Sequence, residues 1–126
     1  MSEIAQRTEE TRLRLAAGLE PTFGNREDAE LAASMLVSWV QGEHGDLINR
    51  GDRARYLAAL EKLPKDVPLP RMLCVSTNTQ DLGPHWRVTF ALGNTAHESP
   101  WSFLTEVAAN GYASRFLSSW AKMSGR

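Results

Sequence analysis

Residues 86–92 decide the fold, and they read Trp86-Arg87-Val88-Thr89-Phe90-Ala91-Leu92. Large apolar side chains alternate here with polar or small ones, and no other stretch of the chain alternates as strongly. Because successive side chains of a strand point to opposite faces, the pattern predicts a strand with one buried face, over residues 86–93. Residues 71–77 predict a second strand, and the turn residues between the two predict an antiparallel hairpin. A lone hairpin is only marginally stable, so we expect helices to cover it, with a short third strand or another chain as further support.

Apolar residues at helical spacing predict three helices before this hairpin. The first covers residues 2–19, with Pro21 as its stop signal. The second runs from the N-cap Asn25 to about residue 41, and its wide apolar stripe is typical of a central, buried helix. The third begins near Asp52 and ends near residue 63.

A fourth helix is predicted after the hairpin. Ser99 is the expected N-cap and Pro100 the first helical residue, because a proline there loses no helical hydrogen bond. Aromatic residues continue at helical spacing to residue 123, and Asn110-Gly111 could kink or split the helix.

Residues 64–70 are the one break in composition, with three prolines in seven residues. They predict a stiff, extended connector between a helical part, residues 1–63, and the hairpin plus C-terminal helix, residues 71–123. Neither part is convincing as a separate domain. We therefore expect one α+β domain over residues 1–126, with about four helices packed on a small antiparallel hairpin or sheet.

The charge balance argues against a general nucleic-acid binder, because the net charge is −1 and the pI about 6.3. The charge is unevenly placed: seven acids and four arginines give residues 1–30 a net charge of −3, whereas residues 67–126 carry +2. The single cysteine, Cys74, lies in an apolar run and is expected in the core. No signal peptide or membrane-length apolar run is present, so we expect a cytoplasmic protein without a membrane partner.

Residues able to carry chemistry are few and scattered. The three histidines, His44, His85 and His97, fall in predicted loops, and no zinc spacing, nucleophile elbow or phosphate-binding loop is present. We therefore predict no catalytic residue, metal or cofactor, and a protein that is not an enzyme. An enzyme site assembled from the three histidines and Glu98 remains a weaker alternative.

Two surfaces are candidates for binding another protein, the function that the composition favours. The expected partner-binding acidic face is formed by the first two helices and consists of Glu9, Glu10, Glu27, Asp28 and Glu30. The expected aromatic face consists of Trp101, Tyr112, Trp120 and the loop of residues 78–85. The prediction is a small non-catalytic protein-binding module, of the inhibitor, immunity-type or accessory regulatory kind, that blocks a partner's surface. A homodimer through the hairpin edge is also open.

The runner-up function is nucleic-acid binding or transcription regulation. It would use a basic helix at residues 50–65, whose cations are Arg50, Arg53, Arg55 and Lys62. The preceding connector is too long for a helix-turn-helix, and a solvated basic face accounts for the same residues.

Overall fold

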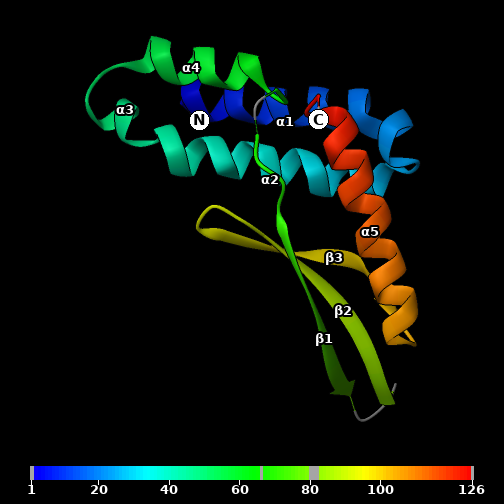
Figure 1. Cartoon of the computed structure of the whole chain (residues 1–126). Coiled ribbons are helices and arrows are strands. Elements are labelled where there is room, and N and C mark those ends of the chain that lie inside the picture. The colour runs from blue at the N-terminus through cyan, green and yellow to red at the C-terminus, as the bar shows by residue number, and fades with distance from the viewer. Residues whose placement is uncertain (1, 66, 80–82, 126) are drawn as a thin grey trace.

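The structure is a computed structural model that describes residues 2–65, 67–79 and 83–125 (Figure 1). Within these residues the chain forms five helices around a three-stranded antiparallel sheet, which confirms the α+β fold class. In chain order the elements are α1 Glu3–Phe23, α2 Arg26–His44, α3 Asp46–Asn49, α4 Arg53–Lys62, β1 Arg71–Thr79, β2 Gly83–Leu92, β3 Thr95–Phe103 and α5 Glu106–Met123.

The predicted hairpin is present, and a third strand extends it. Strand β2 lies between β1 and β3, with Val88 opposite Cys74 in one pair and Phe90 opposite His97 in the other. Val88 and Phe90 are buried, so the face that they share is the core face. The expected loop of residues 78–85 is shorter than predicted, because residues 78–79 and 83–85 belong to the strands. Residues 80–82 lie outside the described part.

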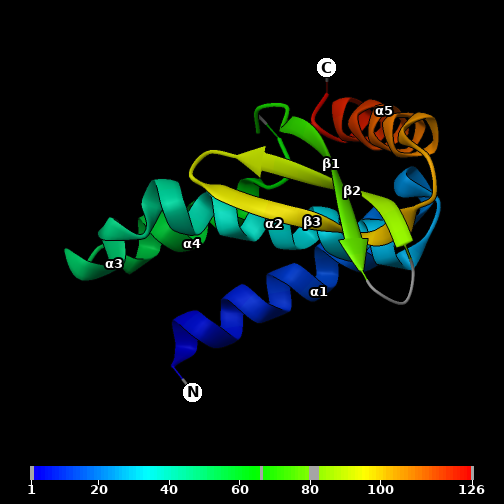
Figure 2. The ribbon, with the colours of Figure 1, turned by 90° about the horizontal axis from the view of Figure 1, so that it is seen from below.

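Helix α2 is the central helix, as its wide apolar stripe predicts. It packs against α1 and α4 on one side and against β3 on the other. Figure 1 shows this order of layers, with α5 running from the helical layer along the sheet. In Figure 2, viewed from below, the sheet lies in front of α2 and its other face is free of helices.

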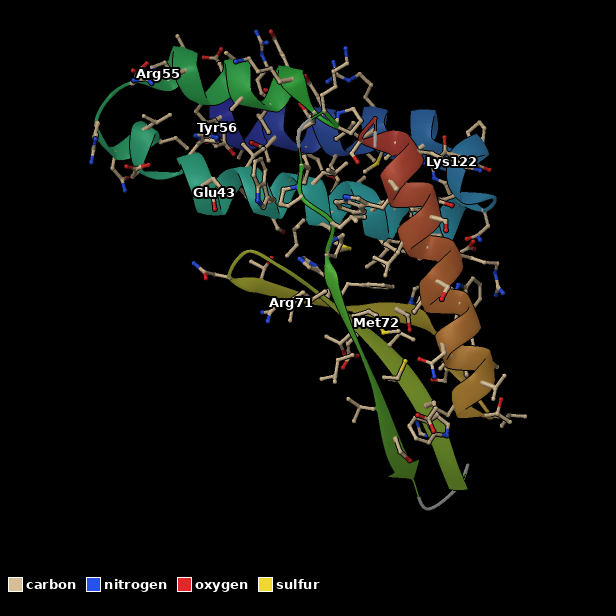
Figure 3. The ribbon with its side chains drawn as sticks, in the orientation of Figure 1. Glu43, Arg55, Tyr56, Arg71, Met72 and Lys122 are labelled. Atoms are coloured by element: carbon tan, nitrogen blue, oxygen red, sulfur yellow. The ribbon has the colours of Figure 1, made fainter. Side chains whose placement is uncertain are left out.

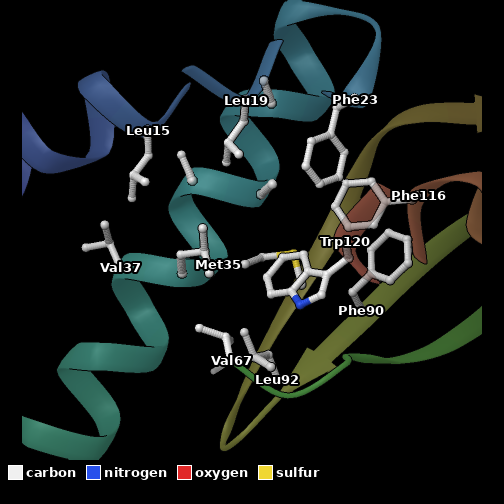
Figure 4. Close-up of a cluster of buried hydrophobic side chains, with 14 of the residues drawn as sticks. Leu15, Leu19, Phe23, Met35, Val37, Val67, Phe90, Leu92, Phe116 and Trp120 are labelled. Carbon is white, nitrogen blue, oxygen red and sulfur yellow. The ribbon is translucent and has the colours of Figure 1, made fainter. Parts of the chain in front are cut away.

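One hydrophobic core joins the two parts that residues 64–70 connect. Phe90 of β2 stacks on Phe116 of α5 with ring centroids 4.4 Å apart, and Phe23 of α1 lies 5.0 Å from Phe116 (Figure 4). Trp120 is fully buried, and its indole N–H donates to the carbonyl of Pro68 at 3.1 Å. The connector is therefore pinned to α5, and the two parts form a single domain.

The end of α1 differs from the prediction, because the helix continues through Pro21 to Phe23. Its C-cap is Gly24, whose left-handed backbone, with φ of 87°, places its N–H 2.8 Å from the carbonyl of Glu20. Burial of Phe23 against Phe116 favours this extra turn. Tertiary packing here outweighs the tendency of proline to end a helix.

The start of the last helix was predicted wrongly. Ser99 and Pro100 belong to β3, and the N-cap of α5 is Thr105, whose side chain accepts from the N–H of Ala108 at 3.1 Å. The register between β2 and β3 shifts at this place, and the bulge accommodates a proline that has no N–H to donate. Helix α5 is not interrupted at Asn110-Gly111.

Candidate functional site

Asp28 joins the predicted acidic and aromatic faces at one point. Its Oδ1 accepts hydrogen bonds from the hydroxyl of Tyr112 at 2.7 Å and from the indole N–H of Trp101 at 3.1 Å. Its Oδ2 accepts from the side-chain amide of Asn25 at 2.8 Å. Asp28 is buried, so this carboxylate ties α2, β3 and α5 together and is not part of an acidic surface.

Local structure explains how these side chains meet. Asn25 caps α2 by accepting from the N–H of Asp28 at 2.9 Å, which places Asp28 in the first turn, where the helix dipole favours a negative charge. Trp101 lies within the β3 bulge, between Glu98, which pairs with Thr89, and Ser102, which pairs with Arg87, and a bulge changes the direction of its side chains. Ser99 stabilises the bulge, because its hydroxyl donates to the carbonyl of Trp101 at 2.8 Å.

The electrostatics of this cluster keep Tyr112 in its phenol form. Burial and the hydrogen bond to Asp28 raise the pKa of Tyr112 well above its ordinary value, and the nearby charge of Arg115 opposes this shift. Tyr112 is therefore a hydrogen-bond donor at neutral pH and not a candidate base.

A cleft of about 650 Å³ opens beside the cluster, between the α1–α2 corner, β3 and α5. Aromatic rings and Asp28 form one part of its wall, and hydroxyls and two cations form another. Its lining includes Phe23, Asn25, Asp28, Trp101, Phe103, Tyr112, Arg115, Phe116, Ser118, Ser119 and Lys122. This volume is typical of small-molecule sites.

The remaining residues of the two predicted protein-binding faces lie in different environments. Trp120 has no exposed surface, so it packs in the core and cannot contact a partner. Glu9 forms an ion pair with Arg12, whose hydrogen bond lowers the pKa of Glu9, and Glu30 forms an ion pair with Arg26 at 3.0 Å. These pairs leave the acidic face with less uncompensated charge than its sequence indicates.

The basic helix is also largely neutralised. Arg50 pairs with Asp46 at 3.4 Å, and Arg55 lies 3.8 Å from Asp52, the N-cap of α4. Arg53 reaches across to Glu3 of α1 at 2.6 Å. Lys62 lines a separate cleft with Trp39 and His44. Three of the four predicted nucleic-acid contacts therefore have an acidic neighbour.

Two residues of the enzyme alternative, His97 and Glu98, are adjacent in β3 and so lie on different faces of the sheet. Glu98 pairs with Arg87 at 3.0 Å, whereas burial lowers the pKa of His97. Among the described residues, no group of three or more His, Cys, Asp or Glu side chains is arranged to hold a metal ion.

The exposed apolar residues beside the edge of β1 are a feature that the sequence reasoning missed, although it left a homodimer through the hairpin edge open. Leu73 and Val75 are 61% and 41% exposed on the sheet face away from the helices, and Leu104 and Val107, at the start of α5, are 85% and 82% exposed. Cys74, expected in the core, is half-buried and donates its S–H to Oδ1 of Asn110 at 3.3 Å. The signal was present in the apolar run around Cys74, because an edge strand exposes such residues when no neighbour covers them.

No protein-family model, curated protein or solved structure matches this chain. A search of the described helices finds none with the length and apolar character needed to cross a membrane.

Proposed function

We propose that this protein is a small non-catalytic protein-binding module, of the inhibitor, immunity-type or accessory regulatory kind, that holds an extended segment of its partner against β1. The observation that carries the proposal is the β1 edge, defined as residues 71–76 of β1 together with Leu104, which precedes α5, and Glu106 and Val107 in the first turn of α5. Figure 3 labels Arg71 and Met72 at the start of this strand.

The β1 edge is suited to strand addition. In the sheet order, β1 pairs with β2 on one side, and within the described chain no strand pairs with its other side. Natural edge strands are normally protected by charged residues, proline, bulges or short length. Strand β1 has nine residues, and its one charged residue, Arg71, stands at its start. A guest strand would pair with the free backbone groups, and its alternate side chains would contact Leu73 and Val75.

Charge indicates what the guest segment carries. Cys74, in the middle of the β1 edge, donates its S–H to Asn110 of α5, and Glu106 lies one helical turn before Asn110 on the same face of that helix. Burial and, secondarily, the negative charge of Glu106 raise the pKa of Cys74. The guest residue opposite Cys74 on that side would meet this carboxylate. The expected guest is therefore an extended segment with apolar residues toward Leu73 and Val75 and a lysine or arginine toward Glu106.

The same charge disfavours a second copy of this chain as the guest. Antiparallel pairing of two β1 strands about Cys74 would place Leu73 of one copy opposite Val75 of the other. It would also bring the two Glu106 carboxylates to the same twofold axis, and like charges placed together oppose association.

The test is capture of the partner from the native host lysate with three immobilised proteins: wild type, the double variant Leu73→Lys/Val75→Lys, and the control Leu13→Lys. Leu13 is 47% exposed on α1, so its variant places a lysine on an apolar surface elsewhere. We expect the captured protein to bind the double variant at least about tenfold more weakly than wild type, and to bind the control normally.

Two measurements on the purified complex complete the test. Hydrogen exchange should show new protection of the β1 amides, and Glu106→Lys should weaken binding more than Glu10→Lys, which changes an exposed acid of the acidic face. Equal binding by wild type and the double variant would overturn the proposal, as would a greater loss from Glu10→Lys. A Leu73-dependent dimer in light scattering would replace the proposed partner with a second copy.

The nucleic-acid alternative has its own readout in the same experiment. Nucleic acid released from wild type as salt rises, and not captured by Arg53→Gln/Lys62→Gln, would favour it over protein binding. The ion pairs of Arg50, Arg53 and Arg55 support the opposite expectation.

A further inference from the structure

The cleft beside Asp28 carries an inference that does not depend on the β1 edge. We infer that it binds a small organic anion whose ring lies on the aromatic wall and whose carboxylate or phosphate lies between Arg115 and Lys122.

Arg115 and Lys122 lie two helical turns apart on α5, and both line the cleft. Figure 3 shows Lys122 near the end of α5, beside α1. Neither residue has an ion pair within 4 Å among the described side chains, unlike Arg12, Arg26, Arg50, Arg53, Arg55 and Arg87. Ser118 and Ser119 add hydroxyls between the two cations. An arginine fork, a lysine and neighbouring hydroxyls are the donors that bind carboxylate and phosphate groups.

The position of Arg115 is supported by two further observations. Arg115 lines the same cleft as Tyr112, and its positive charge opposes the rise in the pKa of Tyr112. Gly111 lies one turn earlier, and a Cβ there would be 3.5 Å from Nη1 of Arg115. The guanidinium therefore lies back along α5 over a residue without a side chain, toward Tyr112.

The aromatic wall supplies the site for a ring. Phe23, Phe103 and Phe116 line it together with Trp101 and Tyr112. Trp101 is 40% exposed although its indole N–H is held by Asp28, so a large aromatic surface is open and fixed in orientation. Fixed aromatic surfaces favour planar ligands, because they offer contact area at little cost in side-chain entropy.

Asp28 does not cancel the cations. Among the residues that the structure describes, it is the single acid that lines the cleft, so this lining carries two positive charges against one negative. Both of its oxygens already accept hydrogen bonds, from Trp101 and Tyr112 on Oδ1 and from Asn25 on Oδ2. The anion is therefore expected on the α5 side of the cleft, and the ring between it and Trp101.

The test separates ring and charge with three probes: 1-naphthyl phosphate, the neutral 1-naphthol and inorganic phosphate. Each is titrated into isotopically labelled protein, and the indole N–H resonance of Trp101, assigned with Trp101→Phe, reports binding by NMR. We expect saturable binding of 1-naphthyl phosphate that is at least about tenfold tighter than that of either other probe, since each charged hydrogen bond contributes enough for such a factor.

The matched variants are Arg115→Gln/Lys122→Gln and Arg12→Gln/Arg14→Gln, which removes two cations from α1. We expect the first to weaken 1-naphthyl phosphate binding at least about tenfold while leaving 1-naphthol unchanged, and the second to change neither. Spectra of the free variants show whether each is folded. Equal binding of 1-naphthol and 1-naphthyl phosphate, an unaffected Arg115→Gln/Lys122→Gln variant, or no saturable shift would each overturn the inference.

Ligand binding in the cleft and partner binding at the β1 edge can be tested separately. Leu73→Lys/Val75→Lys should bind 1-naphthyl phosphate as wild type does, because both substitutions lie on the sheet face away from the helices. If the double variant lost 1-naphthyl phosphate binding, the probe would be bound at the apolar β1 edge and the cleft would not be its site.

Discussion

The two ends of α5 have opposite environments. Its C-terminal half carries Phe116 and Trp120, which are buried against β2, α1 and the connector. Its first turn carries Val107, which follows Leu104, and both are large apolar residues left almost wholly in water. The difference shows that apolar residues at helical spacing hold this fold together only at one end. At the other end such residues stay exposed to solvent.

The largest expected effect lies at the buried end. Trp120→Ala removes a fully buried indole and its hydrogen bond to Pro68, and so should lower the free energy of unfolding by about 3–5 kcal/mol. Urea unfolding followed by circular dichroism measures the loss. A loss below about 1 kcal/mol would show that the connector is not pinned to α5 as described.

Asp28→Ala should have the next largest effect, because it leaves the donors of Tyr112, Trp101 and Asn25 without their acceptor. We expect a loss of about 2–4 kcal/mol in the free energy of unfolding. The control is Glu27→Ala, the exposed neighbour in the same helical turn, which should change stability by less than about 0.5 kcal/mol. Equal effects of the two substitutions would contradict a structural role for Asp28.

The position of Asp28 also shows what the sequence can predict and what it cannot. Alternation over residues 86–92, the Asn25 cap and the apolar stripe of α2 were enough to predict the α+β fold, because each is a local pattern. The sequence around Asp28 indicates only one more acid in the first turn of a helix. Its burial depends on Trp101 and Tyr112, which are 73 and 84 residues away in the sequence and meet it only in the tertiary fold.

The error in predicting where α5 begins has a related cause. Ser99-Pro100 is a strong local signal for a helix start, and Leu104 and Val107 continue its helical spacing. Pairing of β3 with β2 overrides that signal through the bulge, and Thr105 serves as the cap instead. The exposure of Leu73 and Val75 was missed because these residues look like core residues when the strand order is unknown.

Tyr112→Phe removes one hydrogen bond, to Asp28, at the margin of the core. At neutral pH we expect a loss of about 1–2 kcal/mol, from one hydrogen bond to a charged acceptor. Burial and Asp28 raise the folded-state pKa of Tyr112 above its ordinary value of 10.0, so the unfolded chain releases this proton first as pH rises. The stability that Tyr112 contributes is therefore complete below pH 10 and falls above it.

The difference in stability between wild type and Tyr112→Phe should accordingly shrink as pH rises above 10. Urea unfolding of both proteins at neutral pH and in this alkaline range measures it, and groups that titrate in both proteins cancel. A difference that grows with pH would mean that the folded protein favours the phenolate, contrary to the hydrogen bond donated to Asp28.

The smallest effect on stability is expected at the exposed end of α5, from the double variant Leu104→Ser/Val107→Ser. Both side chains are almost fully exposed, so replacing them removes little buried surface, and the free energy of unfolding should change by less than about 0.5 kcal/mol. In the partner-capture assay the same variant should bind more weakly, because the β1 edge would lose apolar area.

A loss of stability above about 1 kcal/mol without a change in binding would mean that these residues pack within the folded chain. The contrast between the two ends of α5 would then be false. Stability kept together with weaker binding would show that one helix serves the core with its last turns and a partner with its first.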